Sequence, residues 1–209
     1  MAKGASRMAG LIVCDVDEVV LHFVSAFRAF LESEGFTLNP KSYALTGNVR
    51  RAGEEEPAGQ AEVSRLLDRF YAANADRLRP VPGAVETLQA LSRTYEIAFL
   101  SNIPEVYIDL RNQNLKAIGL DFALTGNRGP KGPAVRALKW ASAAERVVFL
   151  DDSPRHIRSV RAEVPDAFTI HMIADHRFRA LVGKVAEADL MAASWREARP
   201  AIEALAARS

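Results

Sequence analysis

Short apolar runs alternate with helix-like stretches along most of this chain. Residues 11–14 form a run that is too short for a helix and is typical of a strand buried on both faces of a sheet. From residue 80 onward the alternation of helix and strand repeats. The further predicted strands are residues 95–100, 122–124, 146–150 and 168–173. This pattern predicts an α/β fold with a doubly wound parallel sheet of five strands.

The segment between residues 20 and 79 interrupts this pattern after the first strand. Its apolar positions have helical spacing in residues 20–34 and again in residues 61–78. Residues 36–59 have no clear period and contain several glycine and proline breaks, which predicts mostly loop. We find no strand signal in this segment, and we therefore expect a mainly helical insertion.

Two structural units follow from these assignments. Residues 1–19 and 80–209 are predicted to form the core domain, and residues 20–79 an inserted cap over the carboxyl end of the first strand. The tail, residues 175–208, is predicted to be helical, with breaks near Gly183 and Pro200.

The composition excludes several classes of protein. Of 209 residues, 49% are hydrophobic, and 27 basic against 26 acidic residues leave a net charge of +1. That balance argues against a nucleic-acid-binding or membrane-attracting surface. Cys14 is the single cysteine, so no disulfide can form within the chain. The apolar run after the N-terminus is interrupted by Asp15 too early for an export signal, and we expect a cytoplasmic protein, as monomer or dimer.

Polar side chains gather where the predicted strands end. In a parallel sheet these ends meet at one edge, where ligands bind in open α/β folds. The residues are Asp15, Asp17, Ser101, Asn102, Asp151 and Asp152, with Lys131 in the loop after the third strand. Two aspartates two positions apart point the same way, as for a divalent cation or a proton-transfer pair. Taken singly, these residues are equally typical of solvated turns, helix caps and a surface lysine.

The order of these motifs resembles the haloacid dehalogenase-like (HAD) hydrolase superfamily. Asp15-Val16-Asp17, Leu100-Ser101-Asn102, Lys131 and Leu150-Asp151-Asp152-Ser153-Pro154 match its four motifs in order. The resemblance implies a Rossmann-like core with strand order 5-4-1-2-3. It also implies that the insertion is a C1-type helical cap.

The resemblance also implies a Mg²⁺-dependent phosphatase. Asp15 would be the nucleophile that forms an aspartyl phosphate, and Asp17 the general acid and then the base. Asp15, the backbone carbonyl of Asp17, and Asp152 would bind Mg²⁺, while Asp151 would bond to water or Lys131. Ser101 and the Asn102 backbone would hold the phosphoryl oxygens of a small phosphorylated substrate, and Lys131 would neutralise that group.

The motifs depart from the common family pattern at three positions. Asp151 replaces a glycine, His156 stands where a later acid is common and is interpreted as a helix surface residue, and Glu18 replaces a glycine. The dehalogenases of this superfamily lack an acid at position 17, so Asp17 argues against that class. A sugar phosphomutase and a catalytically silent phosphate-ligand-binding protein stay open as alternatives. Arg50 and Arg51 could meet an anionic substrate tail, but a solvated loop pair is preferred.

Overall fold

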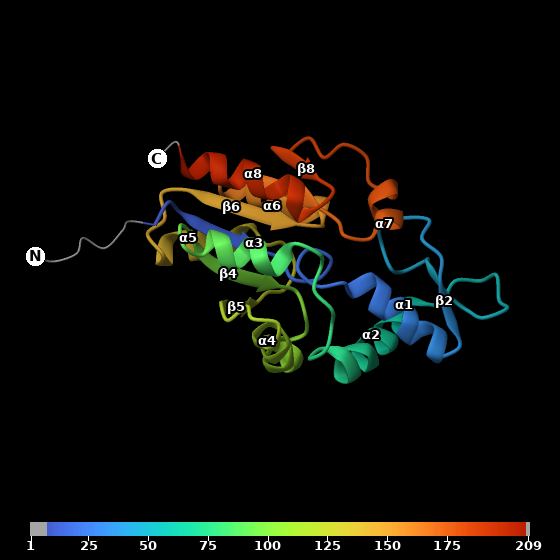
Figure 1. Cartoon of the computed structure of the whole chain (residues 1–209). Helices are drawn as coiled ribbons and strands as arrows, with labels where there is room; N and C mark the ends of the chain where they lie inside the picture. The colour runs from blue at the N-terminus through green and yellow to red at the C-terminus, as the bar shows by residue number, and fades with distance from the viewer. Residues whose placement is uncertain (1–7, 208–209) are drawn as a thin grey trace, which may run out of the picture.

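A six-stranded parallel sheet forms the centre of the computed structural model, which describes residues 8–207 (Figure 1). The order of the strands is β5-β4-β1-β6-β7-β8. Their bounds are β1 Leu11–Cys14, β4 Glu96–Ser101, β5 Ala123–Gly126, β6 Val147–Asp151, β7 Phe168–Met172 and β8 Leu190–Ala192. The first five strands of this sheet along the chain, β1, β4, β5, β6 and β7, have the predicted neighbours, since the predicted order 5-4-1-2-3 read backwards is the order from β5 to β7.

The sixth strand corrects the prediction for the tail. Residues 175–208 were expected to be helical, but they contain β8 between α7 (His176–Leu181) and α8 (Trp195–Ala206). β8 has three residues, too few to give a recognisable alternation of apolar and polar positions. The break near Gly183 is present, whereas Pro200 lies inside α8 and does not end it.

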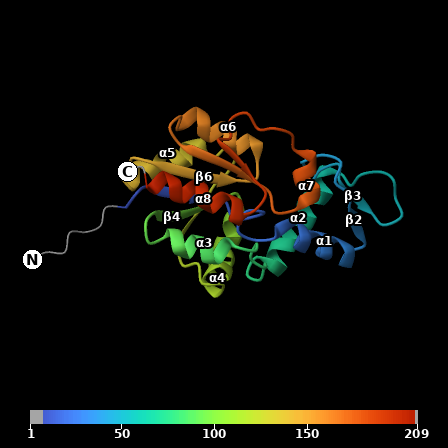
Figure 2. The same ribbon diagram turned by 45° about the horizontal axis from the view of Figure 1, so that its top comes forward.

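Helices cover both faces of the sheet because successive side chains of each strand point to opposite sides. Leu11 and Val13 of β1 pack with α5 and α6, whereas Ile12 and Cys14 pack in the cluster that contains α3, α4 and α8. These helices are α3 Ala84–Leu91, α4 Ile108–Ala117, α5 Gly132–Ala141 and α6 Pro154–Glu163. Figure 2 shows the resulting three layers, with the strands between the two groups of helices.

Residues 20–79, called the inserted segment below, lie beyond the carboxyl ends of the strands (Figure 1). The segment contains α1 (Phe23–Ser33), β2 (Phe36–Leu38), β3 (Val49–Arg51) and α2 (Gln60–Asn74). β2 and β3 form an antiparallel hairpin separate from the main sheet, so the expectation of no strand was wrong. Rings of Phe23, Phe27 and Phe70 pack between the two helices. The division into a core and a cap domain stays a prediction.

Two neighbouring stretches of backbone connect the inserted segment to the sheet. The amide of His22 donates to the carbonyl of Arg79 at 2.9 Å, and the amide of Val81 donates to the carbonyl of Val20 at 2.8 Å. The outgoing and returning chains therefore run side by side, joined by backbone hydrogen bonds.

No helix within residues 8–207 is both long and apolar enough to cross a membrane. Residues 1–7, on which the expectation of no export signal partly depends, lie outside the described residues.

Candidate active site

Asp15 lies one residue beyond β1, and the sheet fixes its position. Its amide donates to the carbonyl of Leu150 at 2.9 Å, which extends the pairing of β1 with β6 by one residue. The Lys131 ammonium, 1% exposed, donates to Asp15 Oδ1 and, at 2.8 Å, to Asp151 Oδ2. Lys131 thus links the ends of two neighbouring strands from the loop that precedes α5.

Three carboxylates share the positive charge of this one lysine. Burial and the neighbouring Asp151 raise the pKa of Asp15 to about 7, against the opposing effect of Lys131. Burial also raises the pKa of Asp152 well above its usual range, and the charges of Asp15 and Asp151 add to that effect. The pKa of Asp151 is lowered instead: Lys131 and His156 outweigh its burial. If all three carboxylates were ionised, their negative charge would exceed what Lys131 compensates, which together with burial favours protonation of Asp15 and Asp152.

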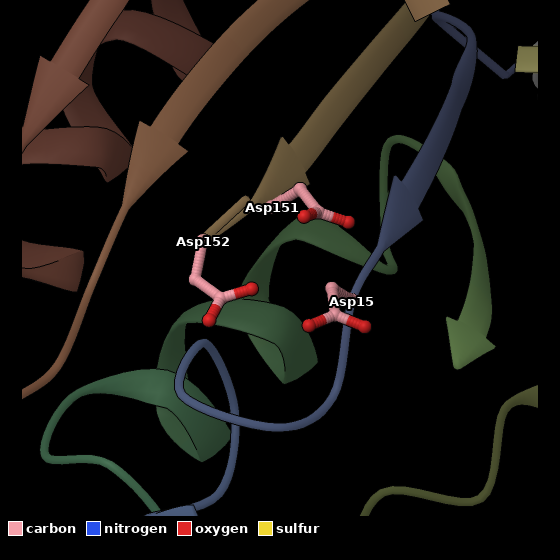
Figure 3. Close-up of side chains that lie close together, drawn as sticks. All are labelled: Asp15, Asp151 and Asp152. Carbon is pink, nitrogen blue, oxygen red and sulfur yellow. The ribbon is translucent and has the colours of Figure 1, made fainter. Parts of the chain in front are cut away.

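The same three carboxylates could hold a metal ion. Asp15, Asp151 and Asp152 each present an oxygen within 4.8 Å of the others, and Figure 3 shows them facing one space at the strand ends. Carboxylate oxygens are the ligands that Mg²⁺ prefers, and a cation there would offset the uncompensated charge. Asp152 Oδ2 accepts a hydrogen bond of 2.6 Å from the hydroxyl of Tyr43, a residue of the inserted segment.

Asp17 lies outside this group of three and has its own charged partner. Its Oδ1 is 3.0 Å from Nη2 of Arg111 on α4, whose side chain is fully buried. The hydroxyl of Tyr71, on α2, lies 3.4 Å from the other carboxylate oxygen of Asp17. None of the three guanidinium nitrogens of Arg111 has a well-aligned hydrogen bond within the described residues. Asp17 is therefore the one carboxylate seen to pair with this buried cation in residues 8–207.

Ser101 and Asn102 lie at the end of β4, next to the cluster. The hydroxyl of Ser101 is buried and accepts a hydrogen bond of 3.2 Å from the amide of Ile103. The Asn102 side chain donates to the carbonyl of Gly129 at 2.9 Å and accepts from the Asn127 side chain at 2.8 Å. These bonds tie the loop after β5, which leads to Lys131, to the end of β4.

Two departures from the family pattern have structural explanations. Glu18 has a φ of 63°, a left-handed conformation that glycine adopts more easily. Its buried carboxylate accepts from the amide of Val24 at 2.6 Å and from the amide of Asp175 at 2.8 Å, and these bonds hold the strained turn. His156 was expected to be a helix surface residue, and this expectation was wrong. Its side chain is 15% exposed, and its Nδ1 lies 3.0 Å from Asp151 Oδ1.

One cavity brings most of the predicted residues together. Of the seven, all except Asp151 line it; they are Asp15, Asp17, Ser101, Asn102, Lys131 and Asp152. Three residues in contact with the predicted carboxylates, Tyr43, Tyr71 and Arg111, were not predicted from the sequence. Tyr43 lies in a stretch predicted to be loop, while Tyr71 and Arg111 occupy ordinary helical positions. No motif marks these three, because each reaches the site only through the packing of its helix or loop.

Comparison with known proteins identifies the fold. No protein-family model and no curated protein sequence matches the chain. A HAD family hydrolase from Deinococcus radiodurans, solved with bound phosphate and sodium, has 18% identity and a TM-score of 0.66 over 94% of this chain and 96% of that chain. The chain has the HAD-like hydrolase fold. A haloacid dehalogenase-like hydrolase from Streptococcus pneumoniae has 12% identity and a TM-score of 0.61 over 90% of this chain and 96% of that chain.

Proteins of several activities share the HAD-like fold. CbbY from Rhodobacter sphaeroides, solved with phosphate, has 17% identity and a TM-score of 0.59 over 91% of this chain and 96% of that chain. L-2-haloacid dehalogenases also match. The fold alone therefore does not select one reaction, and the choice depends on the residues of the site.

Proposed function

We propose that this protein is a Mg²⁺-dependent phosphomonoester hydrolase that acts through an aspartyl phosphate on Asp15. One observation carries the proposal: the Asp15 carboxylate and the buried Lys131 ammonium line the same cavity as Asp17 and Asp152. A phosphate monoester needs a nucleophile, a proton donor and compensation of its negative charge, and this cavity supplies all three.

In the first step a carboxylate oxygen of Asp15 attacks phosphorus, and the bond from phosphorus to the ester oxygen breaks. Asp17 gives a proton to the departing alcohol oxygen. In the second step Asp17 takes a proton from water, and the resulting hydroxide attacks phosphorus. The aspartyl phosphate is cleaved, and the Asp15 carboxylate and inorganic phosphate are released.

The remaining residues bind and orient the phosphoryl group. Lys131 neutralises its charge and fixes the rotamer of Asp15, while Ser101 and the backbone of Asn102 bind its oxygens. Asp15, Asp152 and the carbonyl of Asp17 would hold Mg²⁺, which when bound supplies further positive charge next to the phosphoryl oxygens. Asp151 would position Lys131, because its carboxylate accepts a hydrogen bond of 2.8 Å from the Lys131 ammonium.

The test is to trap the intermediate. The protein is incubated with Mg²⁺ and p-nitrophenyl phosphate, quenched in acid, digested and examined by mass spectrometry. The phosphoryl group is expected on Asp15 and is expected to be absent from an Asp15→Asn variant, which should not hydrolyse the ester. Asp121→Asn is the control, because that carboxylate is 75% exposed and pairs with Lys116 instead.

Three results would contradict the proposal. A phosphoryl group on Asp17 or Ser101 would overturn the assignment of the nucleophile. Undiminished turnover after removal of divalent cations would overturn the role of the metal. Transfer of the phosphoryl group to an added sugar in preference to water, followed by ³¹P NMR, would favour a phosphomutase instead.

A further inference from the structure

The cavity above Asp15 has two unlike sides. Its polar side is the cluster of carboxylates with Lys131, Ser101 and Asn102 described above. Its other side is formed largely by apolar and aromatic side chains of the inserted segment and its neighbours. Its members include Phe23, Leu45, Leu67, Tyr71, Ile103 and Phe178. A phosphoryl group bound at Asp15 would therefore direct the rest of its molecule toward an apolar wall.

This wall offers no positive charge. Among the described residues that line the cavity, Lys131 is the only lysine or arginine, and it is already bonded to Asp15 and Asp151. His156 also lines the cavity, but its Nδ1 is bonded to Asp151. A second phosphate or a carboxylate on the substrate would lose its hydration without gaining a cation, which is strongly unfavourable.

The arginines of the inserted segment do not change this conclusion. Arg50 and Arg51 could have met an anionic tail, but neither lines the cavity. Arg50 donates through Nε to the carbonyl of Glu55 at 2.8 Å, and Arg51 pairs with Glu62. The two arginines lie in strand β3 and not in a loop as expected, and they lie outside the cavity.

The size of the cavity limits the leaving group. The volume is about 270 Å³, near the lower limit of ligand pockets, which is roughly 300 Å³. An apolar cavity of about 150 Å³ accommodates a benzene ring. A phosphoryl group and one ring-sized apolar group therefore fill the space. The rings of Phe23 and Tyr71, whose centroids are 5.9 Å apart, form part of the wall that such a group would contact.

We infer that the substrate is the monophosphate ester of a small apolar alcohol, aliphatic or aromatic, that carries no second anionic group. This inference rests on the proposed function and names its substrate class. Burial of the alcohol against the apolar wall supplies the binding free energy, and the absence of a cation excludes doubly anionic esters.

The first experiment compares three esters that all release a primary alcohol: benzyl phosphate, glycerol 3-phosphate and phosphoglycolate. With Mg²⁺ present, kcat/KM for benzyl phosphate should exceed that for each of the other two at least about 50-fold, because only benzyl phosphate buries a ring. Equal values, or a preference for phosphoglycolate, would overturn the inference.

A variant tests the wall itself. Leu67 is partly exposed on α2 and lines the cavity, so Leu67→Arg introduces a cation there with little disturbance of the core. The ratio of kcat/KM for benzyl phosphate to that for phosphoglycolate should fall at least tenfold. Leu67→Met, which keeps an apolar side chain of similar volume, should leave the ratio within about threefold of the original. An unchanged ratio in Leu67→Arg, with circular dichroism showing a folded protein, contradicts the inference.

Binding separates this inference from the proposed function. Benzylphosphonate and phosphonoacetate have no ester bond, so calorimetry with Mg²⁺ measures their affinities without turnover. Benzylphosphonate should bind at least tenfold more tightly than phosphonoacetate. If it does while no ester is hydrolysed, the proposed function fails and the apolar site stands. If phosphonoacetate binds equally well or better, the substrate class is wrong even if the protein proves to be a phosphatase.

Discussion

Replacement of Asp17 should destabilise the fold as well as impair the reaction. Asp17→Asn removes the carboxylate 3.0 Å from the fully buried guanidinium of Arg111, whose three nitrogens have no well-aligned hydrogen bond within residues 8–207. Removing one partner of a buried ion pair leaves an uncompensated charge and costs about 3 to 5 kcal/mol. For a domain of this size each kcal/mol lowers the melting temperature by about 2 to 4 °C, so a fall of about 6 to 20 °C is expected.

The assay is urea and thermal unfolding of the metal-free protein at pH 7.5, followed by circular dichroism. A double variant, Asp17→Asn with Arg111→Met, removes the cation together with its partner and should recover at least about 2 kcal/mol relative to the sum of the single changes. Asp15→Asn is the matched control. It removes one of three carboxylates that share Lys131, so its cost should be below about 1 kcal/mol.

Two results would refute this reasoning. If Asp17→Asn had the same free energy of unfolding as the wild type, the charge of Arg111 would be compensated without Asp17. Strict additivity in the double variant would show that the two side chains do not interact. The expected loss also has a practical consequence, because turnover by Asp17→Asn must be measured at a temperature at which the variant is still folded.

Two further predictions concern the carboxylate cluster. Because the folded protein holds a proton on Asp15 up to about pH 7, whereas the unfolded chain releases it near pH 4, the folded form binds more protons between these values. Titration of Asp15 should therefore lower the stability of the metal-free wild type relative to Asp15→Asn as pH rises from about 4 to 7, as thermal unfolding would show. Stabilisation by Mg²⁺ should be greater at pH 7.5 than at pH 5.5, and a wild type that gains stability relative to Asp15→Asn over this range would contradict the raised pKa of Asp15. Tyr43→Phe removes the hydroxyl 2.6 Å from Asp152 Oδ2 and should weaken Mg²⁺ binding about tenfold by calorimetry. Tyr107→Phe is the control, because that hydroxyl bonds to Asp68 outside the cavity, and equal affinities in the two variants would separate Tyr43 from the metal.

The buried strands and the motif residues were predictable because their signals are local. An apolar run bounded by charge, as in residues 11–14, determines both the strand and the place where Asp15 emerges from it. The order of the sheet followed from the resemblance, and the structure has the predicted neighbours for those strands.

The parts that were missed depend on packing between segments distant in sequence. β8 is three residues long and is recognisable only through its pairing with β7. The hairpin of β2 and β3 was missed for the same reason, since its pairing joins residues on both sides of a loop. Arg111 occupies an ordinary helical position in α4. It becomes the partner of the Asp17 carboxylate only because α4 packs next to the end of β1. Tyr43 reaches Asp152 across 109 positions of sequence.

The paired linkers at residues 20–22 and 79–81 determine how the inserted segment can move. Two backbones joined by hydrogen bonds form a narrow ribbon, which bends across its width but resists twisting and sliding. Bending of this ribbon is therefore the easiest rotation for the inserted segment, and it carries the segment toward the strand ends or away from them. Glu18 limits that rotation, since its carboxylate holds the amide of Val24 in α1 and the amide of Asp175 just before α7. Any rotation that moves α1 away from Glu18 must break the first of these bonds, whereas the second joins two residues outside the inserted segment. The turn after Asp17, in which Glu18 has a positive φ, therefore loses one of its two restraints whenever α1 moves away from it.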